Sequence, residues 1–462
     1  MSMAVDGLIS GLDTTSLINS LMDFEAAPQR QLKASVVTSN TLVAALQGLN
    51  TSVASLATLA NKSVTADSLN IYAAKSTSSS VTVTAGSTAT TGSLDIVVDK
   101  LAQAQSGVTA AMTTAPGTDF TLVDSAGVKT SITAASTSLD DVAKAINAAD
   151  AGVTATKIAS GTDVNGATQY RLQLIATETG AAGAFALHSG TAAMVDDGTS
   201  TNMLTAPGAA VIRVAQDAEV TLWAGTNAEQ KITSSTNTFT DLLPGVAATV
   251  SAVSAAGADP VTVSVSRDDA AVSTIAKSLV DSLNGVFALI STKSAVVNST
   301  NSAGNPIVSA GVFSGDSTVR DVKQLVLNAA SYPVNGRSPS EIGISITRTG
   351  TMEFDATKFA AAMADDPEFV KSVLTEISSR VASAAGNASD KFDGLITSRI
   401  TGQESLVKSL GTQIENWDLR LNSRRTSLER TYAALEVQLS NMNAQSAWLT
   451  SQVEGLNASK AN

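Results

Sequence analysis

The sequence contains no cysteine and a single histidine, His188, and aromatic residues make up only 4% of the chain. Without cysteine, the chain can form neither disulfides nor thiolate ligands and nucleophiles. One histidine without a spaced acidic or hydroxyl partner makes neither a metal centre nor a catalytic triad. We therefore expect His188 at the surface or in a loop, and we predict no catalytic residue, no metal ligand and no cofactor.

Long apolar runs and basic clusters are also missing. No stretch approaches the roughly 18–20 uninterrupted apolar residues of a membrane-spanning helix. The residues from Met1 to Asp6 include no basic residue and lead into no apolar segment, so we expect no cleaved signal peptide. Acidic residues outnumber basic ones by 41 to 29, and the basic residues are scattered, whereas phosphate binding needs a concentrated positive face. The sequence thus predicts neither membrane insertion nor nucleic-acid binding.

Three acidic motifs have both a structural and a chemical interpretation. Asp163-Val164-Asn165-Gly166 resembles the start of a calcium loop, but the later bidentate Glu is missing, so we favour a hairpin turn. Asp196-Asp197-Gly198 favours a solvated turn over a cation site. The pair Asp365-Asp366, which precedes Pro367, is expected to cap a helix rather than to act as acid and base.

Both ends of the chain show helical periodicity. Near the N-terminus, Asp13 is a predicted N-cap, and the apolar residues after it are expected to share one helix face: Leu17, Ile18, Leu21 and Met22. Pro28 either interrupts this helix or starts a second one, where its missing N–H is harmless. Beyond it, apolar residues alternate spacings of four and three, as in a coiled-coil seam: Leu42, Leu46, Leu49, Val53, Leu56 and Ala60.

The C-terminal end carries a row of apolar residues seven positions apart: Val407, Ile414, Leu421, Leu428, Leu435, Met442, Leu449 and Leu456. The companion position is filled first by Leu410 and Trp417, and after Arg424 and Arg425 by Tyr432, Leu439 and Val453. This phase change is typical of a four-residue stutter. It indicates either a joint between two helical domains, which we favour, or one long helix packed in an ordinary bundle. Trp417 is predicted to be core, and Trp448 beside the row is a candidate intersubunit contact.

The middle of the chain shows the alternation typical of β-strands with one buried face. The clearest strands are 94–98 and 261–265. A compact module lies between them, with two strands around a turn at Gly127, a helix capped by Ser138 and two strands that meet across Asn165-Gly166. The helix is expected to turn three apolar side chains inward: Leu139, Val142 and Ile146.

The chain becomes helical again after Asp268-Asp269, and a short strand pair, 342–346 and 351–354, is expected to turn at Gly350. Because the two helical ends share a pattern that the middle lacks, the economical arrangement is nested. We predict a multidomain α+β protein in which both termini form a long helical coiled-coil stem, with nested β-rich head domains inserted between them. The predicted domains are a terminal helical leg (1–38 and 425–462), a helical bundle with a small β-hairpin (39–70 and 268–424), a β-rich head (71–105 and 211–267) and an inserted outer α+β head (106–210).

Several motifs occur in the same order as in a known family. The opening resembles the N-terminus of flagellar filament cap proteins (hook-associated protein 2) through Val5-Asp6-Gly7-Leu8-Ile9-Ser10-Gly11-Leu12-Asp13-Thr14, Leu21-Met22 and Glu25-Ala26-Ala27-Pro28. Further stretches look like later markers of that family, in the right order: 232–237, 243–246, 267–269, 315–320, 342–344 and 350–355. Met352 and Phe354 stand where the family favours leucine, and residues 106–210 match only loosely.

The resemblance implies a secreted structural and assembly protein of the bacterial flagellum, not an enzyme. Members form a homo-oligomeric ring at the distal tip of the filament, where they promote folding and insertion of exported flagellin and prevent its leakage. They are exported by the flagellar type III apparatus without a cleaved signal peptide. The implied partners are further copies of the chain, flagellin, the hook–filament junction proteins and a cytoplasmic export chaperone that holds the C-terminal helix.

Candidate contact residues lie at both ends, where apolar stripes are not satisfied in a single chain. Contacts with other subunits, the filament or the chaperone are expected on the C-terminal row and beside it, at Leu428, Tyr432, Leu435, Leu439, Met442, Trp448 and Leu449. The N-terminal family motif and the leg contacts are expected at Gly7, Leu8, Ser10, Gly11, Leu12, Asp13, Leu17 and Leu21.

Two other functions stay open. Another flagellar axial component, flagellin-like or hook-associated, would share nested helical termini but would lack the opening from Gly7 to Asp13. A surface adhesin, or a surface enzyme that uses the central module, would need a concave polar cluster, for which the Ala- and Thr-rich residues 106–210 offer few candidates. Adhesion is also a hypothesis for a secondary role of a cap.

Overall fold

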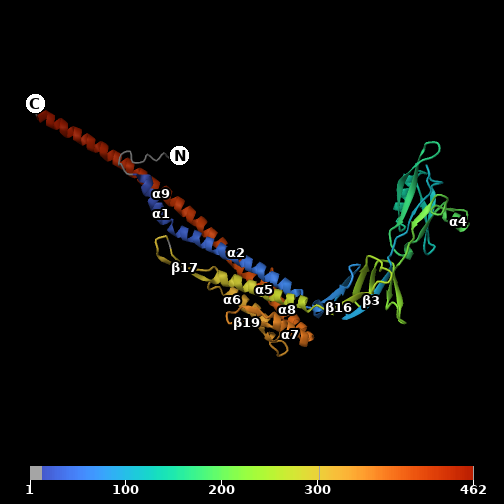
Figure 1. The fold of residues 1–462 in the computed structure, drawn as a ribbon. Coiled ribbons are helices and arrows are strands. Elements are labelled where there is room, and N and C mark those ends of the chain that lie inside the picture. Colours follow the sequence, from blue (N-terminus) through green and yellow to red (C-terminus); the bar gives the residue numbers. More distant parts are fainter. Residues whose placement is uncertain (1–12, 301, 461–462) are drawn as a thin grey trace. The chain divides into compact units, whose positions relative to one another are not determined.

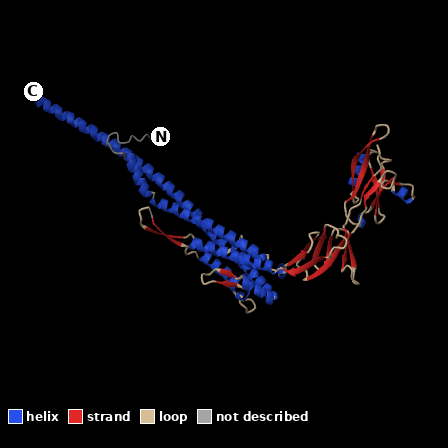
Figure 2. Ribbon diagram, viewed as in Figure 1, coloured by secondary structure: helices blue, strands red, loops and turns tan. Residues whose placement is uncertain are grey.

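The structure, a computed structural model, describes residues 13–300 and 302–460, and the chain divides into two compact units (Figures 1 and 2). The helical unit is formed by both ends of the chain, up to Thr65 and from Ser273 onward. The β-rich unit is formed by the middle of the chain, from Ala66 to Val272. The chain leaves the helical unit once and returns to it, so the nested α+β arrangement is confirmed, while the boundaries of the four domains remain predictions.

The helical unit contains most of the long helices. They are α1 (Thr14–Glu25), α2 (Ala27–Asn61), α5 (Asp269–Ser294), α6 (Ser317–Ser331), α7 (Ala356–Asp365), α8 (Pro367–Ser389) and α9 (Leu395–Lys460). Two antiparallel hairpins interrupt them: β17 (Val296–Thr300) with β18 (Pro306–Ala310), and β19 (Ile344–Ile346) with β20 (Met352–Phe354), which follows a 3-10 turn at Pro339–Ile342. The predicted short strand pair around Gly350 is therefore confirmed.

The predicted seam of α2 lies at the centre of this bundle. Leu46, Leu49, Val53 and Leu56 are fully buried, and α2 packs against α8 and α9. Leu42, the first seam residue, is partly exposed. Among the described helices, α2 is the one long and apolar enough to cross a membrane, a property that core helices of a bundle share.

The starts of the helices follow the sequence signals. The Asp13 carboxylate accepts a hydrogen bond from the Ser16 amide (2.7 Å) and caps α1. Asp366 accepts from the Phe369 amide (3.0 Å) and caps α8, so the capping role predicted for the acidic pair is confirmed at Asp366. Pro28 lies in the first turn of α2, so it starts a second helix rather than only ending the first.

In the β-rich unit, two sheets enclose one core. One has the strand order β1 (Tyr72–Ser76), β16 (Val261–Arg267), β3 (Gly92–Lys100), β12 (Ala218–Leu222) and β13 (Gln230–Ser234), and the other β14 (Thr238–Leu243), β15 (Val246–Val250) and β2 (Val81–Ala85). A 3-10 turn at Ala66–Leu69 precedes them. The alternating residues of both predicted strands point into this core, with Ile96 and Val98 from β3 and Val263 from β16 fully or almost fully buried. Both strand predictions are confirmed.

A second core belongs to a module within residues 106–213, which we call the outer module. It contains two sheets of four strands each. The first has the order β10 (Thr201–Asn202), β9 (Phe185–Ser189), β5 (Asp119–Asp124) and β6 (Lys129–Thr133). The second has the order β11 (Ala210–Arg213), β4 (Ser106–Val108), β8 (Thr168–Ala176) and β7 (Val153–Thr162). They carry α3 (Leu139–Ala148), α4 (Ala192–Asp196) and a 3-10 turn at Ala181–Gly183. Ser138 caps α3 by accepting from the Asp141 amide, and the three predicted apolar residues of α3 are buried in this core.

Three local predictions need correction or refinement here. His188 is not in a loop: it lies in β9, partly buried, with Nδ1 3.0 Å from the Ser200 hydroxyl. The hairpin predicted across Asn165-Gly166 is right in place, but its loop runs from Asp163 to residue 167, because the Asp163 carboxylate accepts from the amides of Asn165 and Ala167. Asp196 is not simply solvated, since it forms an ion pair with Lys129.

The Glu219 carboxylate forms two ion pairs, from which we expect the stability of the β-rich unit to depend on pH. The Glu219 carboxylate lies 2.8 Å from Lys100 Nζ and 2.6 Å from Lys231 Nζ. Hydrogen bonds from Lys100 and then Lys231 lower the pKa of Glu219 to about 2, and the carboxylate raises the pKa of Lys231. A folded-state pKa below the unfolded value stabilises the folded chain above the unfolded pKa, and this contribution disappears as the pH falls toward 2.

We therefore expect Glu219→Gln to lower the urea midpoint of unfolding at neutral pH. The difference from the parent chain should shrink as the pH falls through the range from about 4.5 to 2. The control is Asp259→Asn, which removes an exposed carboxyl group of the same unit. A difference that stays constant over this range would show that Glu219 acts through packing and not through its charge.

Candidate assembly surface

The N-terminal helix α1 packs along α9 in the opposite direction. Thr14, Ile18 and Met22 are buried on the face of α1 that is turned toward α9. The two helices run side by side in Figure 1, and α9 continues beyond the start of α1 as far as Lys460. The two ends of the chain therefore form a paired helical leg, as the sequence predicted.

Polar side chains join α9 to α1 and to the first turn of α2, near the point where α1 ends and α2 begins. The buried side chain of Gln29 donates to Asp418 (2.5 Å), Arg424 pairs with Glu25 (3.0 Å), and Arg425 donates to Asn19 (2.6 Å). These contacts fix which turn of α9 faces which turn of α1. They also explain why two arginines interrupt the apolar companions of the C-terminal row.

The stutter in α9 lies where the helix exchanges one set of partner helices for another. Helix α9 is continuous from Leu395 to Lys460, so the phase change does not break the helix. Before it, α9 packs on α2 and α8, and Leu410 is buried; after it, α9 pairs with α1. Trp417 lies at the transition and is only partly buried, with the Arg420 guanidinium 5.2 Å from its ring, so its assignment to the core is wrong.

The candidate contact residues of α9 become more exposed toward the C-terminus. Leu428, Tyr432 and Leu439 are partly buried. The others are exposed by 45–63%, and Val453 on the same part of the helix by 54%: Leu435, Met442, Trp448 and Leu449. We call Leu435, Met442, Leu449 and Val453, with Trp448 beside them, the uncovered row. In the part of the chain that the structure describes, no other helix covers it.

Of the N-terminal candidates, Gly7, Leu8, Ser10, Gly11 and Leu12 lie outside the described residues. Leu17 and Leu21 do not share the buried face of Ile18 and Met22, because each is 41% exposed. Sequence reasoning missed Phe24, which is 82% exposed and lies on the same side of α1 as these two leucines, at spacings of four and three. We call Leu17, Leu21 and Phe24 the outer stripe of α1.

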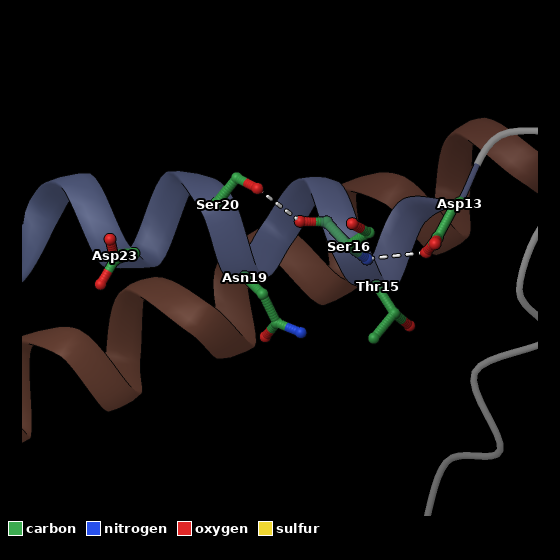
Figure 3. Close-up of a pocket in the computed structure, with 6 residues that line it drawn as sticks. All are labelled: Asp13, Thr15, Ser16, Asn19, Ser20 and Asp23. Carbon is green, nitrogen blue, oxygen red and sulfur yellow. Dashed lines mark hydrogen bonds between the residues drawn. The ribbon is translucent and has the colours of Figure 1, made fainter.

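The remaining face of α1 is polar (Figure 3). It lines an open groove with Asp13, Thr15, Ser16, Asn19, Ser20 and Asp23. These groups bind the helix backbone and neighbouring side chains: Ser20 donates to the Ser16 carbonyl, and Asp23 pairs with Arg30. In Figure 3 they point to both sides of the helix and do not converge on one point. Among the described residues, no group of three His, Asp or Glu side chains could hold a metal.

The uncovered row also predicts where proteases cut. A helix that packs against nothing opens locally at little cost in free energy, so its backbone becomes available to a protease. Brief chymotrypsin digestion of the free chain should first cut α9 beyond Tyr432, where aromatic, leucine and methionine side chains provide its cleavage sites, well before α2 or the sheets of the β-rich unit. Mass spectrometry of the fragments locates the first cuts. Early cuts within α2 would contradict the packing described here.

Two family models match this chain on either side of the outer module. The N-terminal model of flagellar hook-associated protein 2 matches residues 10–105, and its C-terminal model matches residues 215–444. Together they cover more than half of the chain. The chain belongs to the flagellar hook-associated protein 2 family. Its outer module lies between the two matched regions, as expected from the loose resemblance of residues 106–210.

Relatives in this family are similar in sequence over part of their length. The lateral flagellar hook-associated protein 2 of Vibrio parahaemolyticus is 28% identical over 303 residues, which cover 64% of this chain and 61% of that protein. The B-type flagellar hook-associated protein 2 of Pseudomonas aeruginosa is 27% identical over 226 residues, 48% of this chain and 47% of that protein. The chain thus matches from about half to three fifths of the length of these relatives.

The fold is also similar to that of a solved family member. The crystal structure of domains D1, D2 and D3 of the flagellar cap protein FliD from Escherichia coli superposes with a TM-score of 0.60 at 22% identity. The match covers 78% of this chain and 99% of the solved one. It supports the multidomain α+β fold.

Proposed function

We propose that this chain is a structural cap of the bacterial flagellar filament. Several copies form a ring at the distal tip, outside the cell, where the ring holds exported flagellin while it folds and inserts, and prevents its leakage. The observation that carries the proposal is the membership of the family over both ends of the chain, together with the leg that these ends form.

The uncovered row supports an assembly role physically. Burying one large apolar side chain stabilises a contact by about 1.5–3 kcal/mol, and the row offers several on one helix. A single chain leaves them in water. The free energy of covering them is therefore available for contacts with other subunits, with flagellin or with the junction proteins at the base of a new filament.

The same row is a hazard before export, because exposed apolar stripes promote aggregation. We propose that a cytoplasmic export chaperone covers the row by binding the helix in an apolar groove. The chain would then leave the cell unfolded through the flagellar type III apparatus, with its N-terminal residues as the export signal. Adhesion is not part of the proposal, because no described feature of the outer module favours it.

A strain that lacks the gene tests the proposal. We expect short or absent filaments with bare tips, and flagellin in the culture medium, measured by electron microscopy and immunoblotting. Expression of the intact chain from a plasmid should restore filaments and return flagellin to them. Normal filaments and no released flagellin in the deletion strain would contradict a cap function.

A further inference from the structure

The hairpin of β17 and β18, labelled at β17 in Figure 1, is a second uncovered apolar surface in the helical unit. All residues of both strands are exposed. Its apolar side chains are exposed by 42–68%: Val296, Val297, Ile307 and Val308. The pairing of Asn298 with Val308 puts Val296 and Val308 on one face, and Val297 and Ile307 on the other. A two-stranded hairpin with both faces in water is marginally stable, so this one is expected to gain from a partner.

The base of the hairpin is rigid. Phe313 is buried, and its amide donates to the Lys293 carbonyl (2.9 Å), while the Gly311 amide donates to the Ala295 carbonyl (2.9 Å). A side chain at Gly311 would collide with the Lys293 carbonyl oxygen, so the close approach of the two strands requires glycine. The base therefore fixes where the hairpin leaves the end of α5, which limits the entropy lost when the hairpin binds.

The charge of the hairpin favours another copy of this chain as its partner. Residues 294–315 contain no charged side chain, whereas the whole chain carries a formal charge of −12. Identical acidic chains repel each other, and an uncharged surface is where that repulsion is weakest. Exposed strands usually carry charged residues that block edge pairing, and neither β17 nor β18 has one.

The outer stripe of α1 fits this hairpin in size and in charge. From Leu17 to Phe24 the stripe extends about 10 Å along the helix, and the apolar patch of one hairpin face extends about 7 Å. The stripe, like the hairpin, contains no charged side chain, and both acidic residues of α1 are paired within the chain, Asp23 with Arg30 and Glu25 with Arg424. Because the stripe borders the buried face of α1, a neighbour placed on it would widen the existing contact between α1 and α9.

We propose that hairpin β17–β18 of one copy packs on the outer stripe of α1 of the next copy. In a ring with rotational symmetry, each chain contacts its two neighbours through two different surfaces. The hairpin would contact one neighbour, and the outer stripe of α1 would contact the other. This inference rests on the proposed cap function, because it assigns one contact within the proposed ring.

Cysteine cross-linking tests the contact, since the natural chain has no cysteine. We expect Val308→Cys combined with Leu21→Cys to give a ladder of covalent multimers when capped filaments are oxidised. Each single variant should give none, and neither should Val308→Cys combined with Thr15→Cys, which lies on the polar face of α1. Multimers from Val308→Cys alone would show that the hairpin contacts itself and would overturn the proposal.

A photo-reactive benzoylphenylalanine at position 308 distinguishes the other partners. A covalent dimer of this chain, with the adduct mapped to α1, supports the proposal, and an adduct with flagellin or with the outer module overturns it. Electron microscopy of the same samples separates this inference from the cap function. Capped filaments without the expected cross-link would refute the hairpin contact alone, whereas tips without the protein would refute the cap function.

Discussion

Leu435→Asp is expected to abolish motility without lowering the melting temperature of the free chain. Leu435 is 45% exposed in the uncovered row, so an aspartate there stays hydrated in the free chain and disturbs no core. In an assembled contact, the same carboxylate would lie in an apolar seam, where an unpaired charge costs several kcal/mol. Affinity for a chaperone that covers the row should fall as well.

The matched control is Ala433→Asp, which adds the same charge to an exposed position on the opposite face of α9. It should leave motility and chaperone binding close to normal. Melting temperature and swimming on soft agar should be measured for both variants in parallel. A fall of several degrees in the melting temperature for Leu435→Asp would mean that Leu435 belongs to the core of the free chain, and the row would then be structural.

Phe287→Ala is expected to destabilise the helical unit by about 3–5 kcal/mol, because it leaves a cavity where a fully buried ring was. For a unit of this size, that loss corresponds to a fall of roughly 10 °C in melting temperature. Phe392→Ala is the control, since Phe392 is 78% exposed in the same unit and its removal should change stability little.

Thermal unfolding followed by circular dichroism at 222 nm measures this difference, because most of the helix content belongs to the helical unit. The β-rich unit has its own cores and should unfold as in the parent chain. Equal melting temperatures for the two phenylalanine variants would contradict the burial of Phe287, which lies in α5.

Much of the fold could be predicted from the sequence because its signals are local. The seam of α2, the strands 94–98 and 261–265 and the caps Asp13, Ser138 and Asp366 each follow from spacing or from a single side chain, and all are confirmed. Motifs in a fixed order gave the family, which the matches to both ends of the chain confirm.

The errors lie where the partner of a side chain decides its environment. Periodicity placed Leu17 and Leu21 with Ile18 and Met22, but α9 covers only one side of α1, so the four residues divide between two faces. Trp417 fitted the seam, yet it lies where α9 changes from one partner helix to another and stays partly exposed. His188 was expected at the surface or in a loop; it is partly exposed, but pairing with Thr121 and Asn202 makes its segment a strand and not a loop.

The candidate assembly surface, too, could be predicted from the sequence only in part. The heptad row of α9 was visible in the sequence, whereas the hairpin β17–β18 was not, because its short apolar pairs in an uncharged segment look like the interior of any sheet. Only the structure shows that both of its faces are uncovered. Leu17 and Leu21 of the outer stripe were predicted as leg contacts, but Phe24 was missed, because it is recognisable as exposed only once α9 is seen on the other side of α1.

The most direct test of the cap function is the position of the protein on intact filaments. Val164 is fully exposed in the loop between β7 and β8, so Val164→Cys provides a single thiol for labelling with maleimide-coupled gold. We expect gold particles at the distal end of each filament and nowhere along its length, counted by electron microscopy. Label distributed along the filament would show an axial subunit, and label on the cell surface alone would show an adhesin; either result would contradict a filament cap.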